Sequence, residues 1–166
     1  ICVGGDDDDP SCNFSSLRST VDFFADASTT YYILVTGFGT TSTGDYGLTI
    51  SGNCDPGGGG GFDQDGIYDN VCDADDLEIN TSYGFSNTTA TAQAGEPDPG
   101  PGSSPGNTCN STDGWCSFEL DVDNSVWFKF VAPASGCINA SAGTIDLQIA
   151  IWTVGDCNDF GTFTEI

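Results

Sequence analysis

Three aspartates around a tight turn form the arrangement in this sequence that is best suited to chemistry. In the stretch DQDGIYD the carboxylates of Asp63, Asp65 and Asp69 occupy positions one, three and seven, with a glycine at the turn. Ca²⁺ prefers about six to eight oxygen ligands that converge from a short, flexible loop. The spacing therefore predicts a calcium site, with Asp73 and Asp75 as further ligands.

A second acidic cluster follows two glycines near the start of the sequence. Its members are Asp6, Asp7, Asp8 and Asp9. Four adjacent carboxylates repel one another unless a cation lies among them, so we expect calcium here too. The stretch 63–69 resembles a thrombospondin type-3 calcium repeat, which implies the same cation, although the Glu at position twelve of an EF-hand loop is missing. For both clusters the alternative is a solvated acidic loop that keeps the protein soluble.

The composition excludes several classes of function. The 166 residues contain 25 Asp and Glu but only two basic residues, Arg18 and Lys129, so the formal net charge is −23. Binding of nucleic acid or of an anionic membrane surface depends on clustered Lys and Arg. The sequence has no His, which excludes His-assisted nucleophiles and His-based zinc sites. A carboxylate pair can hydrolyse glycosides, but among 25 acids some pair is always close, so we expect a non-enzymatic protein.

Eight cysteines without a Cys-x-x-Cys pair predict disulfides and therefore an oxidising compartment. Cys109 and Cys116 are close enough in sequence to close a local loop. No apolar run approaches the roughly 18 residues of a membrane-spanning helix. We therefore expect a secreted or cell-surface protein that does not insert into a membrane.

Five Asn-x-Ser/Thr sequons are candidate attachment sites for glycans: Asn13, Asn80, Asn87, Asn110 and Asn139. The alternative at each position is an unmodified surface asparagine. A sugar-binding platform could be built from the aromatic residues Trp115, Trp127, Trp152, Tyr31 and Tyr32. Such residues more often pack within and between strands.

Short strands separated by Gly, Asp, Ser and Thr turns predict an all-β fold, a jelly-roll-like β-sandwich. In Ser125–Val131 the residues Val126, Phe128 and Phe130 alternate with their neighbours, which is the period of a strand. The other expected strands are Thr20–Phe24, Tyr31–Thr36, Tyr46–Ile50, Leu77–Ile79, Ser117–Val122, Cys137–Ser141, Ile145–Trp152 and Thr162–Ile166.

Two stretches have the composition of connections. Residues 55–70 begin with Asp-Pro and contain five consecutive glycines, Gly57 to Gly61, which is typical of a linker. Residues 94–107 are rich in Pro and Gly and cannot form a central strand. We expect this second stretch to be an exposed excursion, because it is longer than most loops within a compact domain.

The motifs NVCDADDL (70–77), SVWFKF (125–130), IDLQIAIW (145–152) and GDC (155–157) resemble the first part of a bacterial pre-peptidase C-terminal domain. The second part of that family, with an acidic loop and an aromatic strand, resembles TYYILVTG (30–37) and GDYGLTI (44–50). The resemblance implies a secreted β-sandwich whose parts are present in rotated order. Residues 71–166 then form the first part of the sandwich, 55–70 the linker with the calcium loop, and 1–54 the second part.

The same resemblance implies a disulfide. In the family a Cys after the aromatic strand often pairs with another about ten residues later, and across a join of Ile166 to a following Ile1 these are Cys157 and Cys2. The remaining cysteines cannot be paired from the sequence: Cys12, Cys54, Cys72 and Cys137.

Two arrangements explain the rotated order, a tandem array of copies or exchange of strands between separate subunits. Both give a head-to-tail contact that does not close and therefore propagates as a fibre. The alternative is a circularly permuted monomer with adjacent termini. We expect a structural subunit of an extracellular filament that binds further copies of itself and carries calcium, disulfides and glycans. The rival expectation is a monomeric adhesion or carbohydrate-binding module.

Overall fold

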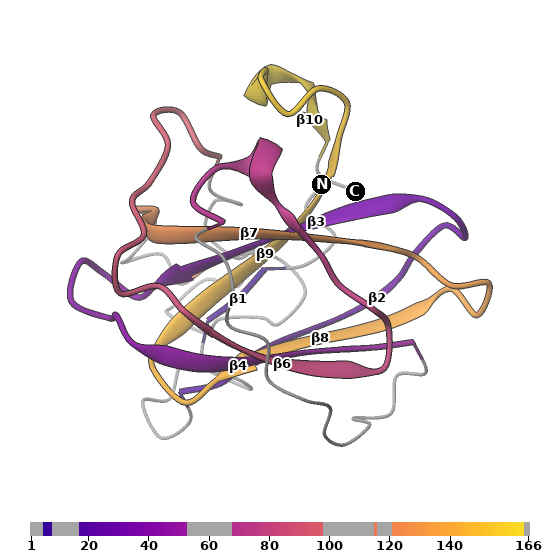
Figure 1. Ribbon diagram of the computed structural model, residues 1–166. Coiled ribbons are helices and arrows are strands. Elements are labelled where there is room, and N and C mark those ends of the chain that lie inside the picture. Colours follow the sequence, from indigo (N-terminus) through magenta and orange to yellow (C-terminus); the bar gives the residue numbers. More distant parts are fainter. Residues whose placement is uncertain (1–4, 8–16, 53–67, 98–114, 116–120, 165–166) are drawn as a thin grey trace, which may run out of the picture.

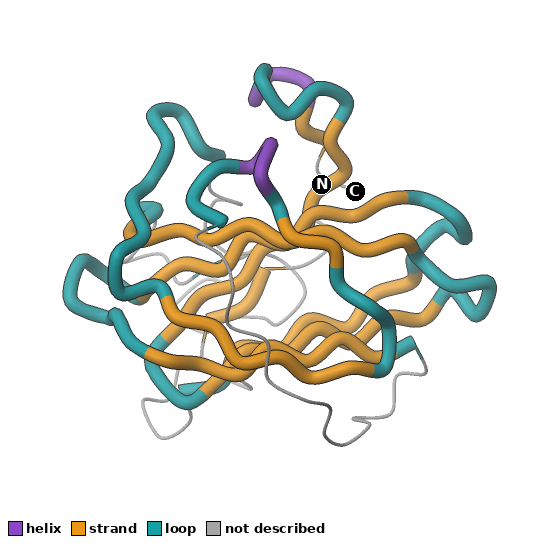
Figure 2. Tube along the Cα trace, in the orientation of Figure 1, coloured by secondary structure: helices purple, strands orange, loops and turns teal. Residues whose placement is uncertain are grey.

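The computed structural model describes residues 5–7, 17–52, 68–97, 115 and 121–164, and these form two β-sheets that pack face to face (Figure 1). The chain is thus an all-β sandwich, as the sequence predicts. In chain order the strands are β1 Gly5–Asp7, β2 Ser19–Phe24, β3 Thr30–Gly37, β4 Asp45–Ser51, β5 Asp75–Asp76, β6 Thr81–Ser86, β7 Asp123–Val131, β8 Cys137–Gly143, β9 Leu147–Val154 and β10 Phe163–Thr164. The helical elements of the described residues are two short 3₁₀ turns, η2 Val71–Asp73 and η3 Phe160–Thr162 (Figure 2).

The larger sheet has the strand order β1-β9-β3-β7-β5, and β10 also pairs with β9. Its central strands are antiparallel, whereas the two-residue strand β5 runs parallel to β7. The smaller sheet has the order β2-β8-β4-β6 and is antiparallel throughout. Strands that are distant in sequence are therefore neighbours in both sheets.

The main core lies between the sheets and follows the period-two patterns of the strands. From β7 the inward residues are Val126, Phe128 and Phe130, which are almost completely buried. The ring of Phe128 packs against that of Phe85 on β6, with 4.3 Å between the ring centroids. Offset and tilted aromatic pairs of this kind add to the stability gained from area burial alone.

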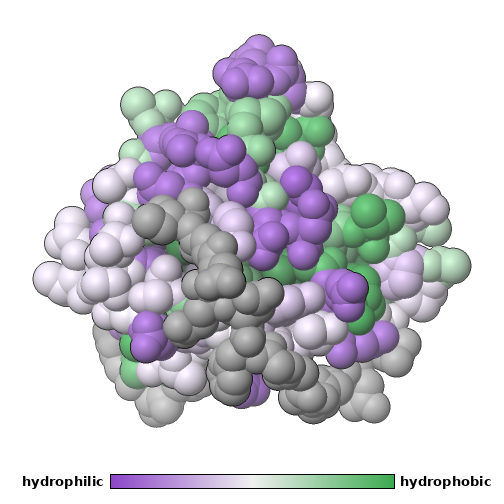
Figure 3. All heavy atoms as spheres, viewed as in Figure 1, coloured by the Kyte–Doolittle hydropathy of each residue, from purple (hydrophilic) through white to green (hydrophobic). Residues whose placement is uncertain are grey.

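A second apolar cluster covers the outer face of the larger sheet. We call it the outer cluster, and its buried members are Leu34, Val71, Ala74, Trp115, Trp127, Ala150 and Trp152. The turn η2 and the β9–β10 hairpin pack over it, so β3, β7 and β9 are covered on both faces. This explains why β9 reads as a continuous apolar run. From outside, hydrophilic side chains alternate with small hydrophobic patches on this view of the molecule (Figure 3).

Several expected strands differ from the observed ones. The expectation at Leu77–Ile79 is wrong, because these residues form a connection that turns at Asn80, with φ +66°. The strand lies further on, as β6, where Tyr83 and Phe85 alternate with Ser and Gly. The strand expected at Thr162–Ile166 is reduced to the two residues of β10, preceded by η3. Ser117–Val122 lies mostly outside the described residues, and residues 121–122 are not in a strand.

Candidate functional site: a seam between two chain segments

The two parts of the sandwich interlock strand by strand. We call residues 5–7 and 17–52 the N-terminal segment, and residues 68–97, 115 and 121–164 the C-terminal segment. Six of the eight strand pairs join one segment to the other: β1–β9, β9–β3, β3–β7, β2–β8, β8–β4 and β4–β6. We call these pairs the seam. Among the described residues, no strand of the N-terminal segment pairs with another strand of that segment.

Asparagine side chains of the C-terminal segment cross the seam. Asn87 is completely buried; its Nδ2 donates to the carbonyl of Ser42 at 3.1 Å, and its Oδ1 accepts from the amide of Gly44 at 2.9 Å. Asn139 on β8 donates to the Asp22 carboxylate on β2 at 2.8 Å. A buried amide that loses such partners carries an unsatisfied polar group, which is costly. These contacts therefore fix the position of the N-terminal segment.

Two of the expected glycan sites have buried side chains. Asn87 is fully buried and Asn139 is 7% exposed, so a glycan at either position would displace the contacts described above, and glycosylation of both stays a prediction. Asn80 is exposed, although its Oδ1 accepts from the amide of Gly52 at 3.0 Å, and glycosylation there stays a prediction. Asn13 and Asn110 lie outside the described residues. A sequon triplet does not reveal whether its asparagine faces a neighbouring strand or the solvent.

The first and last described strands both pair with β9. In β1, Gly5 is opposite Ala150, and in β10, Thr164 is opposite Thr153. Both strands are antiparallel to β9, so β10 and β1 run one after the other in the same direction. Strand β3 pairs with residues 147–152 of β9. On β9, the partners of Gly5 and Thr164 are separated by Ile151 and Trp152.

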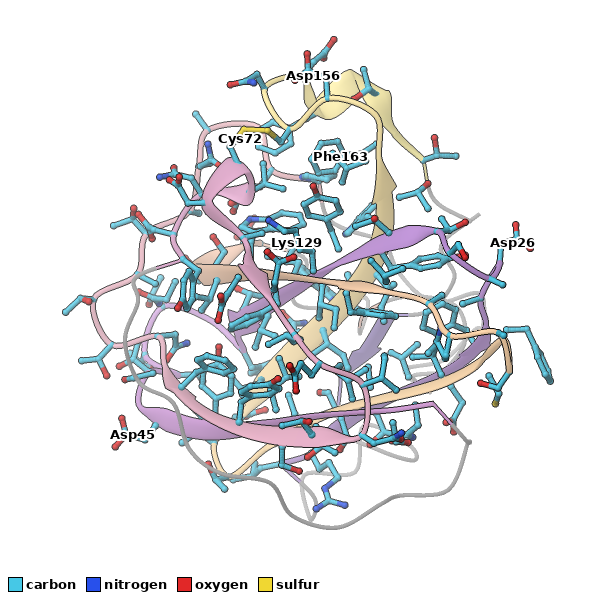
Figure 4. The ribbon with its side chains drawn as sticks, turned by 45° about the vertical axis from the view of Figure 1, so that its right-hand side comes forward. Asp26, Asp45, Cys72, Lys129, Asp156 and Phe163 are labelled. Atoms are coloured by element: carbon cyan, nitrogen blue, oxygen red, sulfur yellow. A yellow bond between two sulfur atoms is a disulfide. The ribbon has the colours of Figure 1, made fainter. Side chains whose placement is uncertain are left out.

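The expected disulfide between Cys157 and Cys2 is wrong. Cys157 is bonded to Cys72, with 5.1 Å between their Cα atoms (Figure 4). The bridge ties η2 to the turn after β9 across the outer cluster, within the C-terminal segment. Cys137 is also disulfide-bonded. Cys2, Cys109 and Cys116 lie outside the described residues, so the pairing of Cys109 with Cys116 stays a prediction.

The described part of the expected calcium loop is held by protein contacts. Both carboxylate oxygens of Asp69 accept bonds from Thr91, one from its amide and one from its hydroxyl at 2.7 Å. Asp73 accepts a weak bond from Asn70 at 3.5 Å. The described residues contain no group of three or more acidic, Cys or His side chains placed to hold a metal. Asp63 and Asp65 lie outside them, and calcium stays a prediction.

The other acidic cluster differs partly from its expected form. Asp6 and Asp7 belong to strand β1, paired with Ile149 and Gln148, and so do not lie in a loop. Asp8 and Asp9 lie outside the described residues. The four consecutive aspartates suggested a loop because Asp has a low strand propensity, but the edge of the long apolar strand β9 provides the missing partner.

Glu96 is a half-buried carboxylate that the sequence did not single out. It accepts from Trp127 Nε1 and from Ser125 Oγ, each at 2.6 Å. Burial raises the pKa of the Glu96 carboxyl above its ordinary value, and the charge of Asp69 adds to this, while the bonds from Ser125 and Trp127 oppose it. Glu96 thus connects the loop after β6 to β7.

We expect Glu96→Gln to change how stability depends on pH. Because burial raises its folded-state pKa, Glu96 binds a proton more tightly in the folded than in the unfolded chain. Its stabilising contribution is complete below the unfolded pKa of about 4.3 and is lost as pH rises through the folded pKa. Urea unfolding at a series of pH values should show the wild type losing stability relative to E96Q above about pH 4.3. Parallel curves would contradict this.

The expected aromatic platform is not on the surface. Trp115, Trp127, Trp152 and Tyr31 are each at most 2% exposed, and Tyr32 packs against the outer cluster. Trp115 uses its Nε1 to donate to the carbonyl of Ile149 at 2.9 Å. These residues are packing residues, which was the alternative that the sequence left open.

No family model, curated protein or solved structure matches the chain. Within the described residues, no helix has the length and apolar character to cross a membrane.

Proposed function

We propose that this protein is a non-enzymatic structural subunit of an extracellular filament. Each sandwich of the filament would combine the C-terminal segment of one copy with the N-terminal segment of the next. The observation that carries the proposal is that, among the described residues, β1 to β4 pair only with strands of the C-terminal segment. The described strands of an N-terminal segment thus find their partners in a C-terminal segment, and that segment can belong to another copy.

The positions of β1 and β10 support the same arrangement. Since β10 and β1 follow one another along β9, the sandwich closes equally well when Thr164 and Gly5 belong to neighbouring copies. The linker of residues 55–70, with its five glycines, would then connect one sandwich to the next. A head-to-tail contact of this kind does not close on itself and so extends into a fibre.

Disulfides, calcium and glycans would stabilise such a filament outside the cell. The bridge between Cys72 and Cys157 supports an oxidising compartment. Calcium at Asp63, Asp65 and Asp69 would lie at the linker between sandwiches. The exposed Asn80 is the described position suited to a glycan.

A disulfide engineered across the seam tests the exchange. Asp22 and Asn139 are opposite each other in β2 and β8, and their side chains touch. We expect D22C/N139C to form covalent multiples of the 17.2 kDa chain, visible as a ladder on a non-reducing gel of assembled material. Each new bond would join neighbouring copies, because the two cysteines belong to different segments.

The matched control is T153C/T164C, which joins β9 to β10 within the C-terminal segment. Its new bond lies within one chain in either arrangement, so it should give no ladder beyond that of the wild type. A monomeric band for D22C/N139C, with isolated globules in negative-stain images, would overturn the filament. That result would favour the monomeric adhesion or carbohydrate-binding module.

A further inference from the structure

The outer face of the smaller sheet has a pocket that differs in character from the rest of the protein. We propose that it binds a small sugar acid, a uronate, with its carboxylate on Arg18. The pocket measures about 420 Å³, within the range of small-molecule sites. It is lined by Leu17, Arg18, Gly47, Thr49, Ser141, Gly143 and Thr144. The proposal does not depend on the filament.

The floor of the pocket is flat because two glycines face each other. Gly47 of β4 is paired with Gly143 of β8, and a Cβ on Gly47 would meet no atom closer than 3.9 Å. A side chain would fit there, so its absence leaves space for a ligand against the backbone. Close approach of a ligand to the backbone is one of the physical uses of glycine in a strand.

A row of hydroxyl groups borders this floor. Thr20, Ser141, Thr49 and Ser82 are opposite one another across all four strands of the sheet. Thr20 donates to Ser141 at 3.3 Å, and Thr49 and Ser82 are 2.7 Å apart. Each hydroxyl has one donor and two acceptor positions, so Thr49 and Ser141, the two members of the row that line the pocket, have acceptor positions for the hydroxyls of a sugar.

Arg18 supplies the positive charge that would bind the carboxylate of the ligand. Of the two basic residues, Lys129 lies on the larger sheet (Figure 4) and pairs with Asp76 at 3.5 Å. The structure gives Arg18 no ion pair with a described residue. A guanidinium binds a carboxylate through two parallel hydrogen bonds. A chain with a net charge of −23 repels polyanions, so the ligand that fits carries one carboxylate.

The pocket also has a strained residue at its rim. Thr144 has φ +110°, a conformation that a β-branched residue rarely adopts. Its hydroxyl donates to the carbonyl of Asp45 at 2.8 Å, which holds the residue in place. Strain of this kind persists where the surroundings impose it and is concentrated at ligand sites.

Titration with sodium D-glucuronate, followed by amide NMR, tests the site. We expect shifts at Gly47, Gly143 and Thr144, and an affinity that falls about tenfold or more in Arg18→Gln, since charged hydrogen bonds are the strong ones. Lys129→Gln, which removes the other positive charge, is the matched control and should bind as the wild type does. D-glucose should bind more weakly by a similar factor, because it lacks the carboxylate.

A second variant separates binding from structure. Thr144→Gly relieves the positive φ and removes a lining hydroxyl, so we expect a melting temperature as high as or higher than that of the wild type, together with weaker glucuronate binding. Absence of shifts in the pocket, or equal losses in R18Q and K129Q, would overturn the proposal. If glucose bound as tightly as glucuronate, the proposed role of Arg18 would be overturned. If acetate bound as tightly as glucuronate, the proposal that the pocket recognises the sugar part of the ligand would be overturned.

Discussion

A chain divided between Gly58 and Gly59 should yield two fragments that fold only when they are mixed. The N-terminal fragment has no strand partners among its own described residues, and the C-terminal fragment lacks β3, which separates β7 from β9. We expect each fragment alone to show little β-structure by circular dichroism. Mixing them under oxidising conditions should restore the spectrum in a one-to-one complex and shift tryptophan emission to the blue, because Leu34 then covers Trp127.

Two variants of the N-terminal fragment make this result specific. Val35 is completely buried in the main core, and Val35→Asp should abolish the recovery, since an unpaired carboxylate is too costly to bury. Phe24 is 85% exposed, and Phe24→Ser should recover as well as the unmodified fragment. Either fragment folding alone to the full β-content would contradict the description of the seam.

Removal of the bridge in Cys72→Ser/Cys157→Ser should lower the free energy of unfolding by about 4 kcal/mol. The two residues are 85 positions apart, and a closed loop of that length greatly restricts the unfolded chain. In the folded protein the bridge also holds η2 and the β9–β10 turn over the outer cluster. Urea unfolding under oxidising conditions, followed by tryptophan fluorescence, measures the loss.

Cys72→Ser alone is the control, because the bridge needs both sulfur atoms and the single variant should lose as much as the double one. A loss below about 1 kcal/mol in both would show that the bridge adds little to the folded state. The double variant should still assemble if segments are exchanged, since Cys72 and Cys157 belong to the same segment.

The strands with clear patterns could be predicted from the sequence, and the weakly patterned ones could not. Burial on one or both faces of a strand determines which of its residues are apolar. The alternation in β7 and the apolar run of β9 are therefore visible in the sequence. β6 was missed because Gly84 and small hydroxyl residues dilute the signal of Tyr83 and Phe85. β1 was missed because its strand character depends on the edge of β9, which is more than 140 residues away.

The contacts of the candidate site were less accessible to sequence analysis. The pairing of Cys72 with Cys157 depends on how η2 packs against the β9–β10 hairpin, and no spacing rule contains that information. Asn87 and Asn139 matched a modification motif, yet their roles are set by partners in another segment. Glu96 and Arg18 are single charged residues without a motif, and only their surroundings distinguish them.

The pairing of both β1 and β10 with β9 has an evolutionary consequence. Because their partners on β9 are close in sequence, the point at which a gene starts and stops is separable from the fold. Duplication of such a gene, followed by a new start within the glycine run, would exchange the order of the two segments and place the junction between β10 and β1 inside the chain. No residue of the core would have to change for this rearrangement.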